Sequence, residues 1–178
     1  MQTGTGILAP PITYAVAGKQ YIAVETGWGG AFALSAGELA RRTQIDRGNI
    51  PRVLVFSLDG TDTLPPVPPA STAVLARLPE SGSASEVATG KLLFHTFCSN
   101  CHGDTAISGG TMPDLRYSAA LRDEALFQKI VHDGILEPKG MVAFGSVLTP
   151  AKIALIRAYV THRVNESVAE QGSAGAVK

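Results

Sequence analysis

The segment Cys98-Ser99-Asn100-Cys101-His102 determines which fold the rest of this sequence has to build. Its C-x-x-C-H spacing is that of a c-type haem attachment site. Two thiols at this spacing lie on one side of a tight helical turn, where each can form a thioether with a haem vinyl group, and the adjoining imidazole can direct its Nε2 at the iron. The segment therefore predicts one covalent haem c held by Cys98 and Cys101, with His102 as the proximal iron ligand.

Two other chemistries use paired cysteines. A zinc site would normally need a second pair of cysteines or histidines, and His95, His132 and His162 do not provide one with the usual spacing. A thioredoxin-like redox pair belongs at the strand-to-helix junction of a βαβ unit, whereas a helical pattern precedes Cys98. Both alternatives stay open at this point, and haem attachment is the favoured interpretation.

The composition is that of a globular chain of 178 residues, of which 45% are hydrophobic and 17% are charged. Such a length has room for one full domain or two small ones. The 15 basic and 15 acidic residues cancel, so the bulk charge indicates neither nucleic acid nor an anionic membrane surface as a partner. Both cysteines lie in the haem motif, so no disulfide framework is expected, and no apolar run has the length of a membrane span.

The haem motif also predicts a location. Covalent haem attachment in bacteria takes place on the exported side of the membrane, so we expect a periplasmic protein. The N-terminal residues Met1-Gln2-Thr3-Gly4 nevertheless lack the basic and apolar regions of a secretory signal. We therefore expect that a signal lies upstream in a longer parent chain or has been replaced.

Residues 1–60 carry the alternating pattern of β-strands. Residues 12–24 predict a β-hairpin with its turn at Ala17-Gly18, and Ala17 would be strained in a type I′ turn, which requires φ > 0. A third strand is expected over residues 52–58. Three strands leave unpaired edges and little core, so this segment looks like a piece of something larger.

Residues 61–84 form the predicted boundary between two parts of the chain. The run Leu64-Pro65-Pro66-Val67-Pro68-Pro69 is dense in proline, which favours extended polyproline geometry and makes a semi-rigid spacer. We expect this Pro-rich linker to be followed by a helical domain over residues 85–166, which carries the haem motif. Residues 167–178, small and polar at their end, are expected to form a flexible tail.

From Ser85 onward the hydrophobic period becomes helical. Ser85 is the expected N-cap, with Glu86 in the first turn facing the positive end of the helix dipole. The helix that leads into the haem motif carries one apolar face, made of Val87, Gly90, Phe94 and Phe97. Because glycine ordinarily weakens a helix, Gly90 on this face predicts the close approach of another backbone.

Two further helices are expected, one over residues 119–132 and one that begins at Thr149 with Pro150 at its first position. The last helix carries an apolar stripe, made of Ile153, Ile156, Tyr159, Val160 and Val164. We expect this stripe to pack on the apolar face of the first helix, with Phe94 and Tyr159 beside Gly90.

The iron has a second axial position, for which the sequence offers Met112, Met141, His95, His132 and His162. Met141 is the favoured ligand because it lies in a loop between the second and third helices, where glycines on both sides allow its thioether to approach the haem. Met112 reads more simply as an apolar pocket residue, His95 is too near Cys98 to reach the distal face, and the other two histidines are expected at solvated helix ends. A Met/His pair raises the haem reduction potential and suits electron transfer, and a filled sixth position argues against oxygen or peroxide chemistry.

Residues 113–116 are expected to form the proximal wall of the haem pocket. Ligating histidines usually donate their other ring N–H to an acceptor, and the Pro113 carbonyl is the candidate acceptor for His102 Nδ1. Arg116 is a candidate donor to a haem propionate, since a guanidinium suits a carboxylate. An exposed surface arginine is the simpler alternative.

These elements together resemble the monohaem class I cytochrome c fold over residues 85–166: a helix, C-x-x-C-H, Pro113-Asp114-Leu115-Arg116, a methionine loop and a closing helix. The preceding part, with Gly18-Lys19-Gln20-Tyr21-Ile22-Ala23-Val24 and Gly27-Trp28-Gly29-Gly30, resembles the end of the propeller in quinohaemoprotein alcohol dehydrogenases. The expected fold class is therefore a mainly α class I cytochrome c domain, preceded by a small antiparallel β segment that resembles the last blade of a β-propeller.

The resemblance implies cofactors and partners beyond these residues. In that family an eight-bladed propeller holds pyrroloquinoline quinone (PQQ) and Ca²⁺ or a lanthanide, and a C-terminal cytochrome takes the electrons. The residues that carry the family's metal ligands, its catalytic aspartate and most of its quinone contacts have no counterpart here, so no catalytic residue is expected and the chain alone should not oxidise alcohol. The implied electron donor is a PQQ-containing propeller domain or subunit.

The expected function is electron transfer through the covalent haem, from reduced PQQ of an alcohol dehydrogenase to a downstream cytochrome, copper protein or oxidase. One alternative makes this chain the cytochrome end of an alcohol dehydrogenase whose catalytic part is supplied by another chain. Others are a stand-alone electron-carrier cytochrome c and a haem-based sensor in which Met141 is displaceable.

Overall fold

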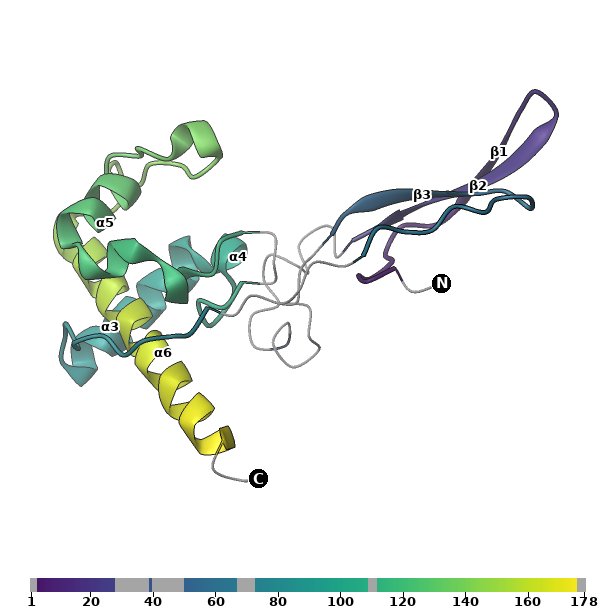
Figure 1. The fold of residues 1–178 in the computed structure, drawn as a ribbon. Helices are drawn as coiled ribbons and strands as arrows, with labels where there is room; N and C mark the ends of the chain where they lie inside the picture. The colour runs from purple at the N-terminus through teal and green to yellow at the C-terminus, as the bar shows by residue number, and fades with distance from the viewer. Residues whose placement is uncertain (1–2, 28–38, 40–49, 67–72, 109–111, 176–178) are drawn as a thin grey trace.

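The computed structural model describes residues 3–27, 39, 50–66, 73–108 and 112–175. Figure 1 shows a small sheet and a larger helical domain. The strands are β1 (Ile12–Val16), β2 (Lys19–Thr26) and β3 (Arg52–Phe56). The helices are α3 (Ala84–Phe97), α4 (Ser99–His102), α5 (Glu124–Val131) and α6 (Pro150–Gly175), with short 3₁₀ helices η2 (Leu115–Tyr117), η3 (Ala119–Arg122) and η4 (Glu137–Lys139). This mainly α domain with a three-stranded antiparallel sheet before it is the predicted fold class.

The sheet has the order β1-β2-β3, with both pairs antiparallel. Its hairpin turn has Ala17 at φ 51° and Gly18 at φ 78°, so both central residues adopt the left-handed conformation that a type I′ turn requires. This conformation costs a residue with a Cβ about 1–2 kcal/mol. The strain expected at Ala17 is therefore present in the structure.

Both faces of the sheet are apolar. On one face the register aligns Ile12, Ala23 and Val55 in a row across the three strands, and Ile12 and Val53 are 63% and 65% exposed. On the other face Ile22 is also exposed. Three strands by themselves bury little apolar surface. The exposed apolar side chains on both faces are typical of a sheet that other elements cover on both sides. Part of the Gly27-Trp28-Gly29-Gly30 segment lies outside the described residues.

Helix α3 begins at Ala84 with Ser83 as its N-cap, so the predicted N-cap, Ser85, is wrong. The reason is a capping box: Ser83 Oγ accepts a hydrogen bond from the Glu86 backbone N–H, and the Glu86 carboxylate accepts one of 2.7 Å from the Ser83 backbone N–H. Only Ser83 stands three residues before the glutamate. The bonds from the Ser83 backbone and side chain favour the ionised carboxylate and hold the pKa of Glu86 below its ordinary value.

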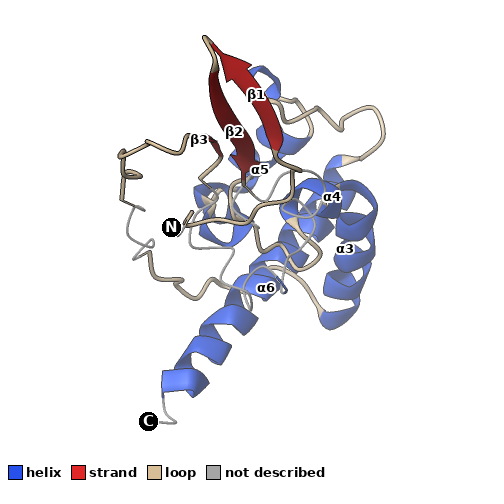
Figure 2. Cartoon of the chain, turned by 90° about the vertical axis from the view of Figure 1, so that its right-hand side faces the viewer, coloured by secondary structure: helices blue, strands red, loops and turns tan. Residues whose placement is uncertain are grey.

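Helix α3 crosses α6 at Gly90, as predicted from the sequence (Figures 1 and 2). A Cβ added to Gly90 would lie 2.0 Å from the carbonyl oxygen of Leu155, so only glycine allows the two backbones to come this close. The rings of Phe94 and Tyr159 pack beside the crossing, with their centroids 5.2 Å apart. Both rings are buried in the core of the helical domain.

The second predicted helix, over residues 119–132, is divided into η3 and α5. Asp123 separates them with an extended backbone (φ −131°, ψ 102°), and its Oδ1 accepts a 3.0 Å hydrogen bond from the Leu126 N–H as the N-cap of α5. An aspartate offers the chain this cap in place of a helical conformation. Phe127 and Val131 of α5 then face the core.

The contacts of the helical domain extend beyond residues 85–166 at both ends. Before α3, Leu75 and Leu78 of the predicted linker are buried, at 5% and 7% exposed. After Glu166, α6 continues to Gly175 through most of the segment expected to be a flexible tail, and Ser167 is buried on it. None of the helices in the described part of the chain has the length and apolarity that crossing a membrane requires.

We predict that Gly90→Ala destabilises the helical domain. The added methyl group meets backbone atoms of Leu155, which cannot rotate away. Overpacking of this kind costs about 1–3 kcal/mol, and we expect it to outweigh the gain of about 1 kcal/mol in helix propensity. Urea unfolding of the haem-loaded chain measures the change, with Lys91→Ala, an exposed position on the same helix, as the matched control. Equal midpoints for the two variants would mean that the crossing tolerates a side chain.

Candidate haem site

The haem motif occupies a single helical turn at the end of α3. Cys98 ends α3, where its N–H donates a 2.8 Å hydrogen bond to the Phe94 carbonyl, and the same residue precedes α4. The N–H groups of Cys101 and His102 both donate to the Cys98 carbonyl, at 3.2 and 3.0 Å. Gly103 ends the turn with φ 76°. The turn thus brings together the two thiols and the imidazole, as their spacing predicts.

The two thiols are free rather than joined in a disulfide, with Cys98 half-buried and Cys101 exposed. Burial, with a smaller contribution from Cys101, raises the pKa of the Cys98 thiol to about 12. A thioredoxin-like pair instead needs a thiol whose pKa is lowered, so that the reactive thiolate forms. Within the described residues, no three His, Cys, Asp or Glu side chains are grouped to hold a metal ion. The Cys98 thiol therefore lacks the lowered pKa on which redox-thiol chemistry depends.

The ring of His102 is half-buried, and this burial lowers its pKa, while the Pro113 backbone and the Asp114 carboxylate oppose this by raising it. Its Nδ1 is buried and has no hydrogen bond within ordinary limits of distance and angle among the described residues. The Pro113 carbonyl therefore influences the ring, as expected of the predicted acceptor, without completing the bond. Because no hydrogen bond among the described residues fixes Nδ1, the orientation of the imidazole is compatible with its being set by a bound group.

Arg116 is neither exposed nor free. Its Nε and Nη2 donate to the two carboxylate oxygens of Asp114, at 3.0 and 2.7 Å, and its Nη1 donates to Ser167 Oγ on α6 at 3.4 Å. Asp114 also accepts from the Arg116 backbone N–H at 3.0 Å and caps η2. The alternative of an exposed surface arginine is therefore wrong. The bond from Arg116 to a haem propionate stays a prediction, and it would use the guanidinium N–H groups that do not bind Asp114 or Ser167. Sequence reasoning missed Asp114, although an aspartate two residues before an arginine is a signal for such a cap.

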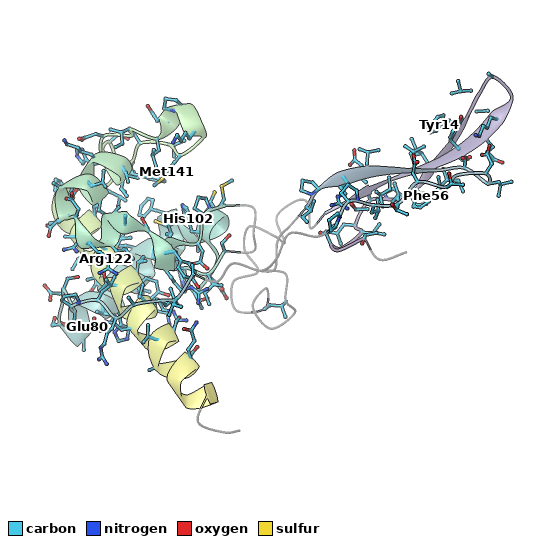
Figure 3. All side chains as sticks on the ribbon, viewed as in Figure 1. Tyr14, Phe56, Glu80, His102, Arg122 and Met141 are labelled. Carbon is cyan, nitrogen blue, oxygen red and sulfur yellow. The ribbon has the colours of Figure 1, made fainter. Side chains whose placement is uncertain are left out.

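Met141 lies on the loop that follows α5 and η4, and its side chain packs against the core (Figure 3). Gly140 precedes it with φ 92°, a left-handed conformation that reverses the chain. The N–H groups of Phe144 and Gly145 then donate to the carbonyls of Val131 and His132 at the end of α5, at 2.8 and 3.0 Å. These bonds hold the methionine loop against the helical domain.

The other candidate axial ligands have local partners or an exposed position. His95 Nε2 lies 2.6 Å from the Asp104 carbonyl oxygen, and His132 Nδ1 lies 2.7 Å from Asp133 Oδ1. His162 lies within 3.5 Å of the carboxylates of Glu80 and Glu166. Met112 is exposed. Of these candidate ligands, Met141 is the one whose side chain packs on the core from the loop after α5.

These side chains form a donor set that fits a c-type haem. Two free thiols and a half-buried imidazole share one turn, the buried Nδ1 lacks a bond of its own, and a thioether packs on the same domain from the methionine loop. Other partly buried apolar side chains pack against the same core as Cys98 and Met141, among them Phe97, Leu115, Ile130 and Phe144. Such residues can bind the porphyrin faces and exclude water from the iron.

The family model described as "Cytochrome C oxidase, cbb3-type, subunit III" matches residues 85–160. The chain is 45% identical over 163 residues to the dehydrogenase subunit of alcohol dehydrogenase (quinone) from Gluconobacter oxydans, covering 92% of this chain and 21% of that protein. It is 43% identical over 164 residues to quinohemoprotein alcohol dehydrogenase ADH IIB from Pseudomonas putida, covering 91% and 23%. The chain thus spans about a fifth of the length of these relatives.

Solved structures agree with the sequence matches. The quinohemoprotein alcohol dehydrogenase ADHIIG from Pseudomonas putida HK5 superimposes with a TM-score of 0.81 at 32% identity, covering 97% of this chain and 24% of that one. The enzyme from Comamonas testosteroni superimposes with a TM-score of 0.65 at 25% identity, covering 100% and 23%. Residues 85–160 are therefore a cytochrome c domain, and the chain is homologous over most of its length to the cytochrome-bearing part of quinohaemoprotein alcohol dehydrogenases.

Proposed function

We propose that this chain is the electron-transfer part of a PQQ-dependent alcohol dehydrogenase. The observation that carries the proposal is the single turn that presents two free thiols and a half-buried imidazole beside an apolar core. When bound, the haem supplies a one-electron couple between Fe(III) and Fe(II). The chain itself makes and breaks no substrate bond, and its role is to hold and surround the iron.

Each site residue has one task in this proposal. Cys98 and Cys101 hold the haem covalently, His102 is the proximal ligand, and Met141 is the distal ligand. Pro113 accepts from His102 Nδ1, which keeps the ring in one tautomer. Arg116 donates to a propionate while its bonds to Asp114 and Ser167 keep the guanidinium in place.

The donor and location follow from the relatives. Their names describe quinone-dependent and quinohaemoprotein alcohol dehydrogenases, so we infer that the electrons come from reduced PQQ in a propeller domain or subunit, with Ca²⁺ or a lanthanide beside the quinone. The acceptor is a downstream cytochrome, copper protein or oxidase. Because covalent haem is attached on the exported side of the bacterial membrane, we place this reaction in the periplasm.

Alcohol-dependent haem reduction tests the function. Mixing the haem-loaded chain with a PQQ-containing propeller protein and a primary alcohol should produce the absorption spectrum of reduced haem. The mixture without alcohol and the propeller protein with alcohol but without the chain are the controls. A haem that dithionite reduces but the complete mixture does not would contradict the proposed donor.

We predict that the haem is attached through both thiols. Protein matured in an exporting host should keep its haem through acid–acetone extraction, because thioether bonds survive conditions that remove a merely coordinated haem. Replacing both Cys98 and Cys101 by alanine should make the haem fully extractable. Wild-type protein that loses its haem to the acetone phase would argue against covalent attachment.

We predict that Met141 is the distal ligand. Met141→Ala should abolish the weak sulfur-to-iron absorption band near the red end of the oxidised spectrum and lower the reduction potential, since a thioether ligand raises that potential. Met112→Ala is the matched control and should leave both unchanged. The reverse pattern would move the assignment to Met112, and a wild-type spectrum that lacks the band would argue against a methionine ligand.

A further inference from the structure

Part of the linker is bound to the helical domain rather than free in solvent. Leu78 belongs to the core cluster of the domain, and Leu75, three residues earlier, is also buried. Residues 74–76 and Leu78 also line a groove of about 200 Å³, whose other wall is formed by residues 116–119 and Arg122. The linker therefore has a defined path over the domain before α3 begins.

The side chain of Asn165, on α6, makes the polar bonds that fix this path. Its Oδ1 accepts a 2.8 Å hydrogen bond from the Leu78 N–H, and its Nδ2 donates to the Leu78 carbonyl at 2.9 Å. Nδ2 also donates to Glu80 Oε1 at 2.8 Å. The side-chain amide thus pairs with both backbone groups of Leu78, as the backbone of a neighbouring strand would. Asn165 is only 6% exposed. Glu80 is labelled in Figure 3.

Only an amide of this length satisfies all three partners. Leucine would leave the buried N–H and carbonyl of Leu78 without a bond, at a cost of about 1–3 kcal/mol for each group. Aspartate could still accept from the Leu78 N–H, but it would face that carbonyl and the Glu80 carboxylate with oxygen atoms alone. The contact therefore selects one register of the linker on α6.

Asn165 lies on α6 beyond residues 85–160, which match the cytochrome family model. The same extension carries Ser167, which accepts from Arg116, so this part of the helix binds both the linker and the segment after the haem motif. A linker that is partly bound to the haem domain leaves a shorter free spacer between this domain and the N-terminal residues. The haem domain can therefore take fewer positions relative to those residues than with a fully free linker.

We propose that Asn165 is a positioning residue: it fixes the linker at Leu78 and so restricts where the haem domain sits relative to its electron donor. The idea rests on the proposed function for its purpose, because the donor is placed on the N-terminal side of the linker. The contact itself is independent of haem chemistry, which allows the two to be tested separately.

Amide hydrogen exchange on the haem-loaded full chain tests the proposal. Asn165→Asp should make the Leu78 region exchange about tenfold faster or more, as expected for the loss of bonds to a buried peptide and a carboxylate. Exchange in α3 and the haem reduction potential should not change. Gln171→Glu, which adds the same charge at an exposed position of α6, is the matched control and should leave the linker protected.

A second variant separates positioning from a general structural role. In Asn165→Asp/Glu80→Gln the amide and the carboxylate exchange places, so residue 80 can donate to residue 165, and protection of the linker should return in part. Unchanged exchange in Asn165→Asp would overturn the proposal, as would faster exchange that spreads through α3 or a double variant without recovery. Failure of the proposed function would appear instead in the wild-type chain, as a haem that reduced PQQ does not reduce.

Discussion

The contact between the backbones of α3 and α6 at Gly90 is the constraint on which the rest of the helical domain depends. Because position 90 has no Cβ, the α3 backbone lies directly on the Leu155 carbonyl, and the rings of Phe94 and Tyr159 are buried together beside the crossing. Helix α3 runs straight into the haem motif through the bond from Cys98 to Phe94. The position of the thiols is therefore set by a helix crossing rather than by the loop that carries them.

The haem site combines this rigid turn with segments that side chains and backbone bonds hold in place. The methionine loop is bound to the end of α5 through Phe144 and Gly145, and the segment after the motif is held by the Asp114–Arg116 pair against α6. Each side of the predicted haem pocket is thus attached to a helix. In the proposed haem site, such support would hold His102 and Met141 in place when the charge of the iron changes.

The two parts of the chain bury apolar surface in different ways. The helical domain forms its own core, which includes Leu78 of the linker. The sheet leaves apolar side chains on both faces, as Ile12, Ile22 and Val53 show. That difference agrees with the similarity to proteins of which this chain spans about a fifth, because sheets that are apolar on both faces usually have both faces covered by other elements.

The sequence by itself determined the features that depend on the spacing of a short motif or on the residue type at a single position. The C-x-x-C-H turn, the strained hairpin at Ala17 and the close crossing at Gly90 all follow from local geometry, and the structure shows each of them. The family match adds the cytochrome domain that those features predict.

Tertiary structure decided the choices between residues that are locally equivalent. Ser83 and Ser85 are both good caps, and only the reach of Glu86 selects the first. The sequence also holds no sign that Asn165 pairs with Leu78, because 87 positions separate them. Hydrogen bonds between segments that far apart exist only after the chain has packed, so periodicity and propensity, which describe neighbours along the chain, could not predict them.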